Sequence, residues 1–142
     1  MWHLSFEDIE RQFVKNFVIS TRQERANYEL TSESKRGRFF SRLAHSYSRI
    51  FKMESMTKIP RLRAEQEFSE IMLMLKTHGA KTHCYIMSYA REFDRKVLPV
   101  EEGIYQCVNG SLEAILICSD KLAFFQAERV SGSPPRFLLK AN

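Results

Sequence analysis

Apolar positions at the start of the chain recur at the spacing of a helix. They lie three or four residues apart, at Phe6, Ile9, Phe13 and Phe17. Ser5 precedes them as an N-cap, and Glu7 and Asp8 complement the dipole of a first turn. We therefore predict a first helix from Ser5 to about Gln23. We interpret residues 25–34, which are polar with a weak period, as helix end plus connection.

Residues 35–53 predict a second, amphipathic helix. Its apolar stripe follows the spacing i, i+4, i+8 and i+11 at Phe39, Leu43, Tyr47 and Ile50. A cationic ridge follows beside it at Arg38, Arg42, His45, Arg49 and Lys52. The stripe should be buried and the ridge exposed. A third helix is expected from Pro60, with inward positions at Ala64, Phe68, Ile71 and Leu75 and an end at Gly79.

The last 60 or so residues have the composition of strands. We expect a first strand at residues 83–89 and a short helix from Pro99 to Asn109 and Gly110. Residues 112–118 and 122–127 predict a hairpin, and residues 136–140 a final strand.

These elements predict an α+β fold. About three N-terminal helices should cover one face of a small, mostly antiparallel sheet of about four strands. The order of the second part is βαβββ, with one short helix after the first strand. We expect a single domain over residues 1–142, with a helical part at 1–79 and a sheet part at 80–142.

Charge is concentrated in one window. Residues 35–63 contain nine Lys and Arg residues and one acid, Glu54, so this window has a net charge of +8. The whole chain has a net charge of +5, so the residues outside the window sum to −3. Such a patch favours an anionic macromolecule as partner. The predicted binding residues are Arg36, Arg38, Arg42, His45, Arg49 and Lys52. Glu24, Glu29 and Glu33 lie just upstream and could pair with Arg36 or Arg38, which would reduce this surface.

Several classes of function lack their sequence features. The chain has no Gly-rich phosphate loop or nucleophile elbow, so we expect no cofactor. We predict no metal site, because His83 and Cys84 are adjacent on a strand and point to opposite faces. No apolar run is longer than residues 114–118, which is too short to cross a membrane. Residues 1–12 carry no secretory signal, and three cysteines without paired spacing suit a reducing compartment, so we expect a cytoplasmic protein.

One short segment, RFFSRLAHSY, resembles the motif of HEPN ribonucleases in its spacing of Arg38, His45 and Tyr47. The resemblance implies that His45 acts as general base or acid on a 2′-hydroxyl. Arg38 would then stabilise the phosphorane-like transition state. The chain departs from that all-helical family by its predicted sheet, and by Phe39 where the family usually has a polar residue.

The order of segments along most of the chain is similar to a group of small uncharacterised bacterial proteins. The segments are RQERANYEL, SKRGRFFSRLAH, HGAKTHCYIMS, VLPVEEGI, ILICSDKLAFFQAE and RFLLK. The resemblance implies a bacterial or phage origin and one compact domain, with no activity to transfer. Tyr89, Ala90 and Arg91 replace the acidic stretch that the group has after its first strand.

These observations support a non-catalytic binding or inhibitor module that docks an acidic macromolecule. A protein partner, in the manner of an immunity protein or antitoxin in bacterial conflict, is favoured over nucleic acid. The preference rests on the −3 outside the basic window and the absence of RRM or KH signatures. One alternative is a nucleic-acid-binding protein, in which Phe40 or Tyr47, if exposed, could stack on a base. The other is a metal-independent HEPN-like ribonuclease.

Overall fold

The structure, a computed structural model, describes residues 5–142, so the first four residues of the segment tested for a secretory signal lie outside it. Six strands form one antiparallel sheet in the order β1-β6-β5-β4-β2-β3. They are β1 (Met56–Lys58), β2 (His83–Met87), β3 (Val97–Pro99), β4 (Ala114–Ser119), β5 (Leu122–Gln126) and β6 (Arg136–Lys140). The helices are α1 (Phe6–Phe17), α2 (Gln23–Thr31), α3 (Arg36–Ile50), α4 (Glu67–Thr77) and α5 (Val100–Gly110). The predicted α+β class is confirmed.

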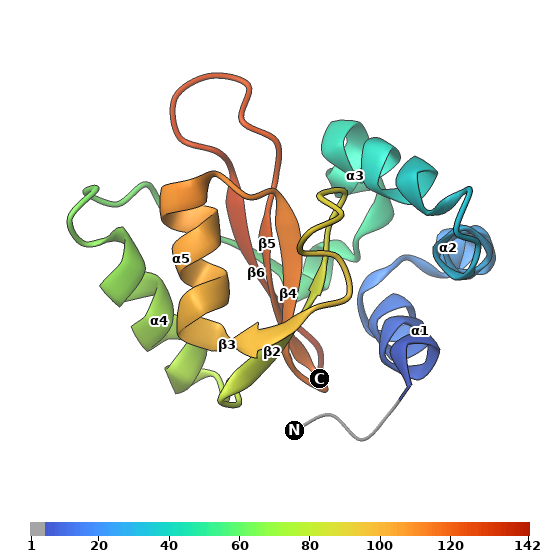
Figure 1. Cartoon of the computed structure of the whole chain (residues 1–142), viewed down its shortest axis with the longest axis horizontal. Helices are drawn as coiled ribbons and strands as arrows, with labels where there is room; N and C mark the ends of the chain where they lie inside the picture. The colour runs from blue at the N-terminus through green and yellow to red at the C-terminus, as the bar shows by residue number, and fades with distance from the viewer. Residues whose placement is uncertain (1–4) are drawn as a thin grey trace.

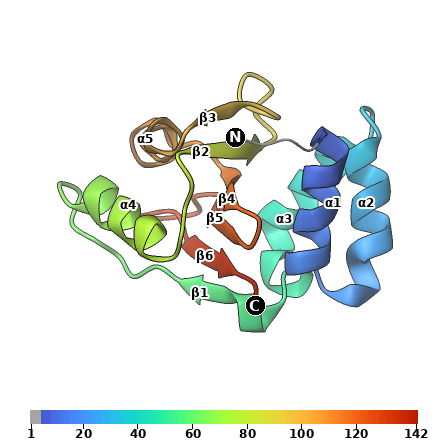
Figure 2. The ribbon, with the colours of Figure 1, turned by 90° about the horizontal axis from the view of Figure 1, so that it is seen from below.

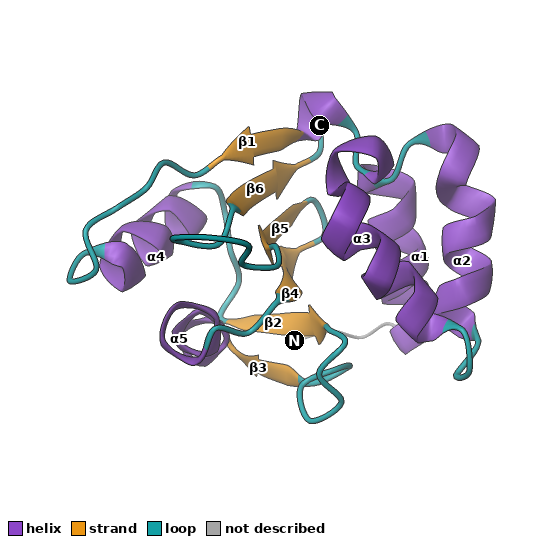
Figure 3. Cartoon of the chain, turned by 90° about the horizontal axis from the view of Figure 1, so that it is seen from above, coloured by secondary structure: helices purple, strands orange, loops and turns teal. Residues whose placement is uncertain are grey.

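Helices cover both faces of the sheet. Figure 1 shows α1, α2 and α3 on one side of the strands and α4 and α5 on the other, and Figure 3 shows the same three layers from above. The prediction of helices on one face only was wrong. The physical reason lies in the strands, because β2 and β4 are apolar at nearly every position and so present apolar side chains to both faces.

Each face of the sheet has its own core. Tyr85 and Met87 of β2 point to the cluster under α1, α2 and α3. Cys84 and Ile86, the alternate positions of the same strand, point to the cluster under α4 and α5. Figure 2 shows these two helical layers on opposite sides of the strands. The molecule therefore has a three-layer α/β/α arrangement around a sheet that is buried on both faces.

Several predicted elements are confirmed. The β4–β5 hairpin pairs Ala114 with Gln126, and β6 has the predicted bounds. Ser5 caps α1, since its hydroxyl accepts a hydrogen bond from the Asp8 amide at 3.2 Å. Gly79 follows the end of α4 with a positive φ of 95°, as a residue after a helix C-cap commonly does.

The boundaries of the N-terminal helices differ from the prediction. The first helix ends at Phe17, not near Gln23, because Val18 turns to extended backbone and bridges Phe51. The segment predicted as helix end plus connection contains a separate helix, α2. The helix predicted from Pro60 is α4, and it begins only at Glu67, because the chain between Pro60 and Glu67 is irregular.

Two short strands were not predicted. β1 comes from the part of the chain predicted as helical and pairs with β6, while β3 pairs with β2 and directly precedes α5. Each has three residues, and Thr57, Lys58 and Val97 are exposed, so neither has an alternating apolar pattern to detect. They lie at the two edges of the sheet, which therefore has six strands and not about four. Across residues 5–142, the structure has no helix long and apolar enough to cross a membrane.

Candidate functional site

The helix α3 carries most of the predicted site residues and separates two surfaces. Its inner side is buried through Phe39, Leu43 and Ile50, as the apolar stripe predicted. Arg38, His45 and Arg49 are exposed. The backbone departs from helical geometry at Ser46, with φ −144° and ψ 33°. The last turn of the helix is therefore set at an angle to the turns that carry Arg38 and His45.

Arg36, predicted as a binding residue, lies inside the molecule with 6% of its surface exposed. Its guanidinium donates two hydrogen bonds to Glu10 of α1 and two to Asp94 in the β2–β3 connection. Burial alone would lower the pKa of Arg36, but the hydrogen bonds to Glu10 and Asp94 outweigh it and raise the pKa. Arg36 therefore joins three segments of the fold and does not belong to an exposed basic surface.

Tyr47 also belongs to the packing of the fold. Its ring lies against the rings of Phe125 and Phe137, with centroids 5.6 and 5.0 Å away. Lys52 is half-buried beyond the end of α3, and its Nζ donates to the Lys15 carbonyl at 3.0 Å, in the last turn of α1. A cation at that position stabilises the negative end of the helix dipole.

Arg42 faces α2 and meets both an acid and two further arginines there. Glu29, whose side chain is buried, forms ion pairs with Arg42 and with Arg25, the latter at 3.5 Å. The pKa of Arg42 is lowered, first by burial and then by the positive charges of Arg25 and Arg22. The single buried carboxylate therefore does not neutralise the three arginines.

The acids upstream of α3 find partners other than those expected. Glu29 pairs with Arg42 and not with Arg36 or Arg38, while Glu33 pairs with Arg95 at 3.1 Å. Arg38 and Arg49 form no ion pair with any residue from 5 to 142 and remain exposed. We define the arginine face as the outward surface of α2, the turn before it and α3, formed by Arg22, Arg25, Arg38, Arg42 and Arg49.

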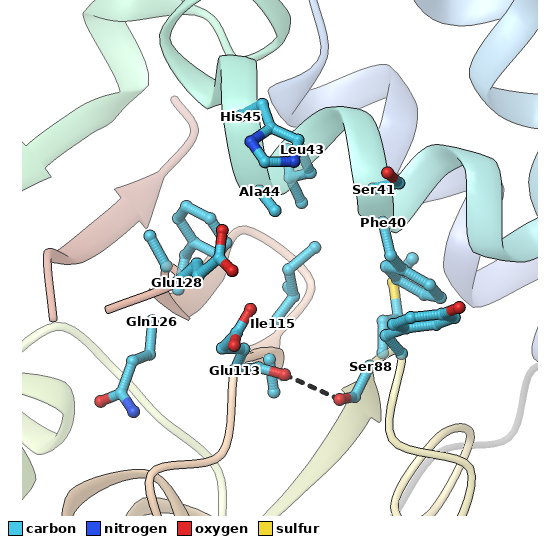
Figure 4. Close-up of a pocket in the computed structure, with 15 residues that line it drawn as sticks. Phe40, Ser41, Leu43, Ala44, His45, Ser88, Glu113, Ile115, Gln126 and Glu128 are labelled. Atoms are coloured by element: carbon cyan, nitrogen blue, oxygen red, sulfur yellow. Dashed lines mark hydrogen bonds between the residues drawn. The ribbon is translucent and has the colours of Figure 1, made fainter. Parts of the chain in front are cut away.

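His45, an exposed residue of α3, lines a pocket between this helix and the sheet. The pocket has a volume of about 280 Å³. Its residues come from α3, the end of β2, the start of β4 and the end of β5. Figure 4 shows the His45 imidazole on α3 across the cavity from the side chains of Glu113 and Glu128.

The charged groups around this pocket are acidic. Glu113 precedes β4 and Glu128 follows β5, and the antiparallel register places both at one edge of the hairpin. The pKa of Glu113 is raised, first by partial burial and then by the negative charge of Glu128. No Lys or Arg of the described chain lines the pocket.

Of the three HEPN-like residues, the structure brings only His45 to the pocket. His45 lines the pocket, whereas Arg38 is not among its lining residues and Tyr47 packs against the core. Two carboxylates in the same pocket would repel a phosphate placed beside His45. No three His, Cys, Asp or Glu side chains within residues 5–142 come together as a metal site would require.

Comparisons of the chain with protein-family models, with curated proteins and with solved structures find no match.

Sequence reasoning missed Glu113, Glu128 and the Ser88–Tyr89 segment as site residues. A signal for the two acids was present, because Glu113 directly precedes the apolar run 114–118 and Glu128 directly follows the predicted strand 122–127. An acid before the first strand and an acid after the second meet at the open end of an antiparallel pair. The sequence pattern does not indicate that α3 lies across this end of the hairpin and forms the other wall of the pocket.

Proposed function

We propose that the chain is a non-catalytic binding module whose arginine face docks an acidic protein partner, as an immunity protein, antitoxin or inhibitor does. One observation carries the proposal. Arg22 and Arg25 lie close to Arg42, and the only acid paired with any of these three arginines within residues 5–142 is the buried Glu29, which contacts Arg25 and Arg42. After burial, the positive charges of Arg25 and Arg22 lower the pKa of Arg42 further. A surface with uncompensated positive charge gains stability when a carboxylate of a partner approaches it.

The composition of this surface suits a protein interface. Tyr28 lies on α2 with 56% of its surface exposed. The ammonium of Lys35 lies 4.7 Å from the centre of its ring and donates a hydrogen bond to its hydroxyl. This hydrogen bond and the charge of Lys35 lower the pKa of the Tyr28 hydroxyl, and Arg38 makes a smaller contribution in the same direction. Tyr and Arg are the residues most enriched among those that carry binding energy at protein interfaces. We therefore include Tyr28 in the docking surface.

Nucleic acid is the second candidate for the same face, since exposed arginines also contact phosphates. The aromatic residues of α3 that could have stacked on bases are not available for it. Phe40 is buried and Tyr47 packs against Phe125 and Phe137. The ribonuclease alternative is supported less, because Glu113 and Glu128 give the pocket of His45 the wrong charge for a phosphate.

The first experiment separates these three functions. The purified protein is titrated with fluorescent single- and double-stranded RNA and DNA over a salt series, and the same samples are run on a denaturing gel. We expect intact nucleic acid and no binding below about 10 μM at 0.1 M salt. Tight binding with a steep salt dependence would make the chain a nucleic-acid-binding protein instead. Cleavage that is lost in His45→Ala would establish the ribonuclease.

A second experiment tests the protein partner. Nuclease-treated lysate of the cells that encode the chain is passed over immobilised wild type, the double variant Arg38→Glu/Arg49→Glu and the control Lys58→Glu. Lys58 is an exposed cation on the edge strand β1, outside the arginine face. An acidic protein held by wild type and the control, but not by the double variant, is then purified and titrated against all three. Equal affinity of the purified protein for wild type and the double variant would overturn the proposal.

A further inference from the structure

The pocket between α3 and the sheet has an apolar floor. Leu43 of α3, Met87 of β2, Ile115 of β4 and Phe125 of β5 are all buried residues that line it. Its volume of about 280 Å³ lies just below the range for small-molecule pockets, which are typically about 300–1,000 Å³. A floor of this kind fits an apolar body of about the size of one aromatic ring.

Two carboxylates, Glu113 and Glu128, line the pocket beside its apolar floor. In Figure 4 the carboxylates of Glu113 and Glu128 lie on the same side of the cavity, facing the helix α3. Neither carboxylate has an ion-pair partner anywhere in the described chain. Two unpaired carboxylates beside an apolar floor repel each other, and a cation between them would relieve that repulsion.

The walls of the pocket are held in place before any ligand binds. The Ser88 hydroxyl donates to the Glu113 carbonyl at 2.7 Å, and the Ala90 amide donates to the Ser88 hydroxyl at 3.1 Å. The Ser88 amide in turn donates to Asp94, which is held by Arg36. The end of β2 and the start of β4 are therefore fixed relative to each other, and a preformed site loses less conformational entropy on binding.

We propose that this pocket binds a small organic amine, with the apolar body against Leu43, Ile115 and Phe125 and the ammonium group between Glu113 and Glu128. The site is independent of the proposed docking function. It lies between α3 and the sheet, whereas the arginine face lies on α3, α2 and the turn before α2. The pocket carries two acids and the face carries arginines.

The test is a titration followed by NMR of the ¹⁵N-labelled protein with phenethylamine at low salt. Two matched probes replace the ammonium group with a hydroxyl, in 2-phenylethanol, and with a carboxylate, in 3-phenylpropionate. We expect phenethylamine to shift the amide signals of Ala44, Ser88 and Ala127 in a saturable way. It should bind at least tenfold more tightly than the alcohol, and the carboxylate should not bind.

Variants locate the ammonium group. Glu113→Gln/Glu128→Gln should weaken phenethylamine at least tenfold and leave the alcohol unchanged. The control is Glu92→Gln, because Glu92 lines the neighbouring hollow of about 390 Å³ and not this pocket. Ala44→Phe should fill the cavity and abolish binding of both probes, with the NMR spectrum showing that the variant is folded.

Three results would overturn the proposal. The first is the absence of saturable shifts up to about 10 mM phenethylamine, which corresponds to a binding free energy of less than about 3 kcal/mol. The second is equal affinity for the amine and the alcohol. The third is unchanged affinity for phenethylamine in the double Gln variant. None of them bears on the arginine face. Failure of this proposal therefore leaves the docking proposal intact, and the reverse also holds.

Discussion

Arg36 and Glu10, 26 positions apart in the chain, form a two-pronged ion pair inside the helical layer. The guanidinium Nη1 lies 2.6 Å from Glu10 Oε1, and Nη2 lies 2.5 Å from Oε2. Asp94 holds the other edge of the same group at 2.7 and 3.0 Å, and the Tyr85 hydroxyl donates to Glu10 at 2.6 Å. One guanidinium thus ties α1, α3 and the β2–β3 connection together.

Replacing Arg36 should destabilise the fold strongly. Arg36→Met removes the cation but leaves the buried Glu10 and the half-buried Asp94 without it, and breaking such a pair typically costs about 3–5 kcal/mol. Arg36→Lys should recover only part of the loss, since an ammonium group cannot make both two-pronged contacts. Urea unfolding followed by circular dichroism measures the free energy of unfolding.

The matched control is Arg49→Met, the same change at an exposed position of the same helix. It should alter the free energy of unfolding by less than about 0.5 kcal/mol. Equal effects at the two positions would show that the buried ion pairs of Arg36 do not stabilise the fold.

Arg36 also shows where sequence reasoning stops. The period of Phe39, Leu43 and Ile50 identified the buried side of α3 correctly. Arg36 was assigned to the surface because its charge made exposure the default expectation. Its partners lie 26 and 58 positions away, and no local pattern indicates which arginine will meet two distant carboxylates.

The sheet was predictable where its strands carry an apolar run and not elsewhere. β2, β4, β5 and β6 have such runs and are predicted, whereas β1 and β3 are short and partly exposed. The apolar run of β4 also carried information that was not used, because apolar side chains on both faces require a cover on both faces. His45 was identified as a candidate, but its pocket was not, since the walls come from four separate segments.

Gly103 on α5 should tolerate no side chain. A Cβ built there would lie 2.9 Å from Cys84 Sγ and 3.2 Å from Leu116 Cδ1, so the helix approaches the sheet at this point more closely than alanine allows. Gly103→Ala should destabilise the fold by about 1–3 kcal/mol, despite the better helix propensity of alanine. The control is Gly110→Ala on the same helix, where the nearest atom belongs to the flexible Gln106 side chain, and thermal melting compares the two. A stabilised Gly103→Ala would show that the contact has room to relax.

The three cysteines should be chemically silent in the folded protein. Burial raises the pKa of Cys84 from an ordinary 9.0 to about 12, and it also raises the pKa of Cys107 and Cys118. At pH 8 a disulfide reagent such as DTNB should therefore titrate no thiol in the native protein and all three in denaturant. Rapid reaction of any thiol at native conditions would contradict the burial.

The same shift of the thiol pKa makes the fold sensitive to alkali. Between pH 9 and pH 12 the folded chain holds the Cys84 proton that the unfolded chain releases, so the free energy of unfolding should fall as the pH rises through this range. Cys84→Ala should flatten this dependence, and urea unfolding at a series of pH values measures the slope. An unchanged slope would mean that other groups account for the loss.

The ionised Glu113 carboxylate should lower the free energy of unfolding at neutral pH. Its pKa is raised by partial burial and by Glu128, so the folded chain binds the Glu113 proton more tightly than the unfolded chain does. Ionisation above that pKa therefore favours unfolding, and Glu113→Gln should raise the melting temperature slightly at pH 7. The difference should vanish below about pH 3, where the carboxyl is protonated in both states.

The control for this prediction is the same measurement in a Glu128→Gln background, where Glu113→Gln should have a smaller effect. It is needed because His45 and Tyr89 also line the pocket that Glu113 faces. A lower melting temperature for Glu113→Gln at pH 7 would show that the carboxylate has a favourable partner within the fold, and the pocket would then lack the unpaired charge that attracts an amine.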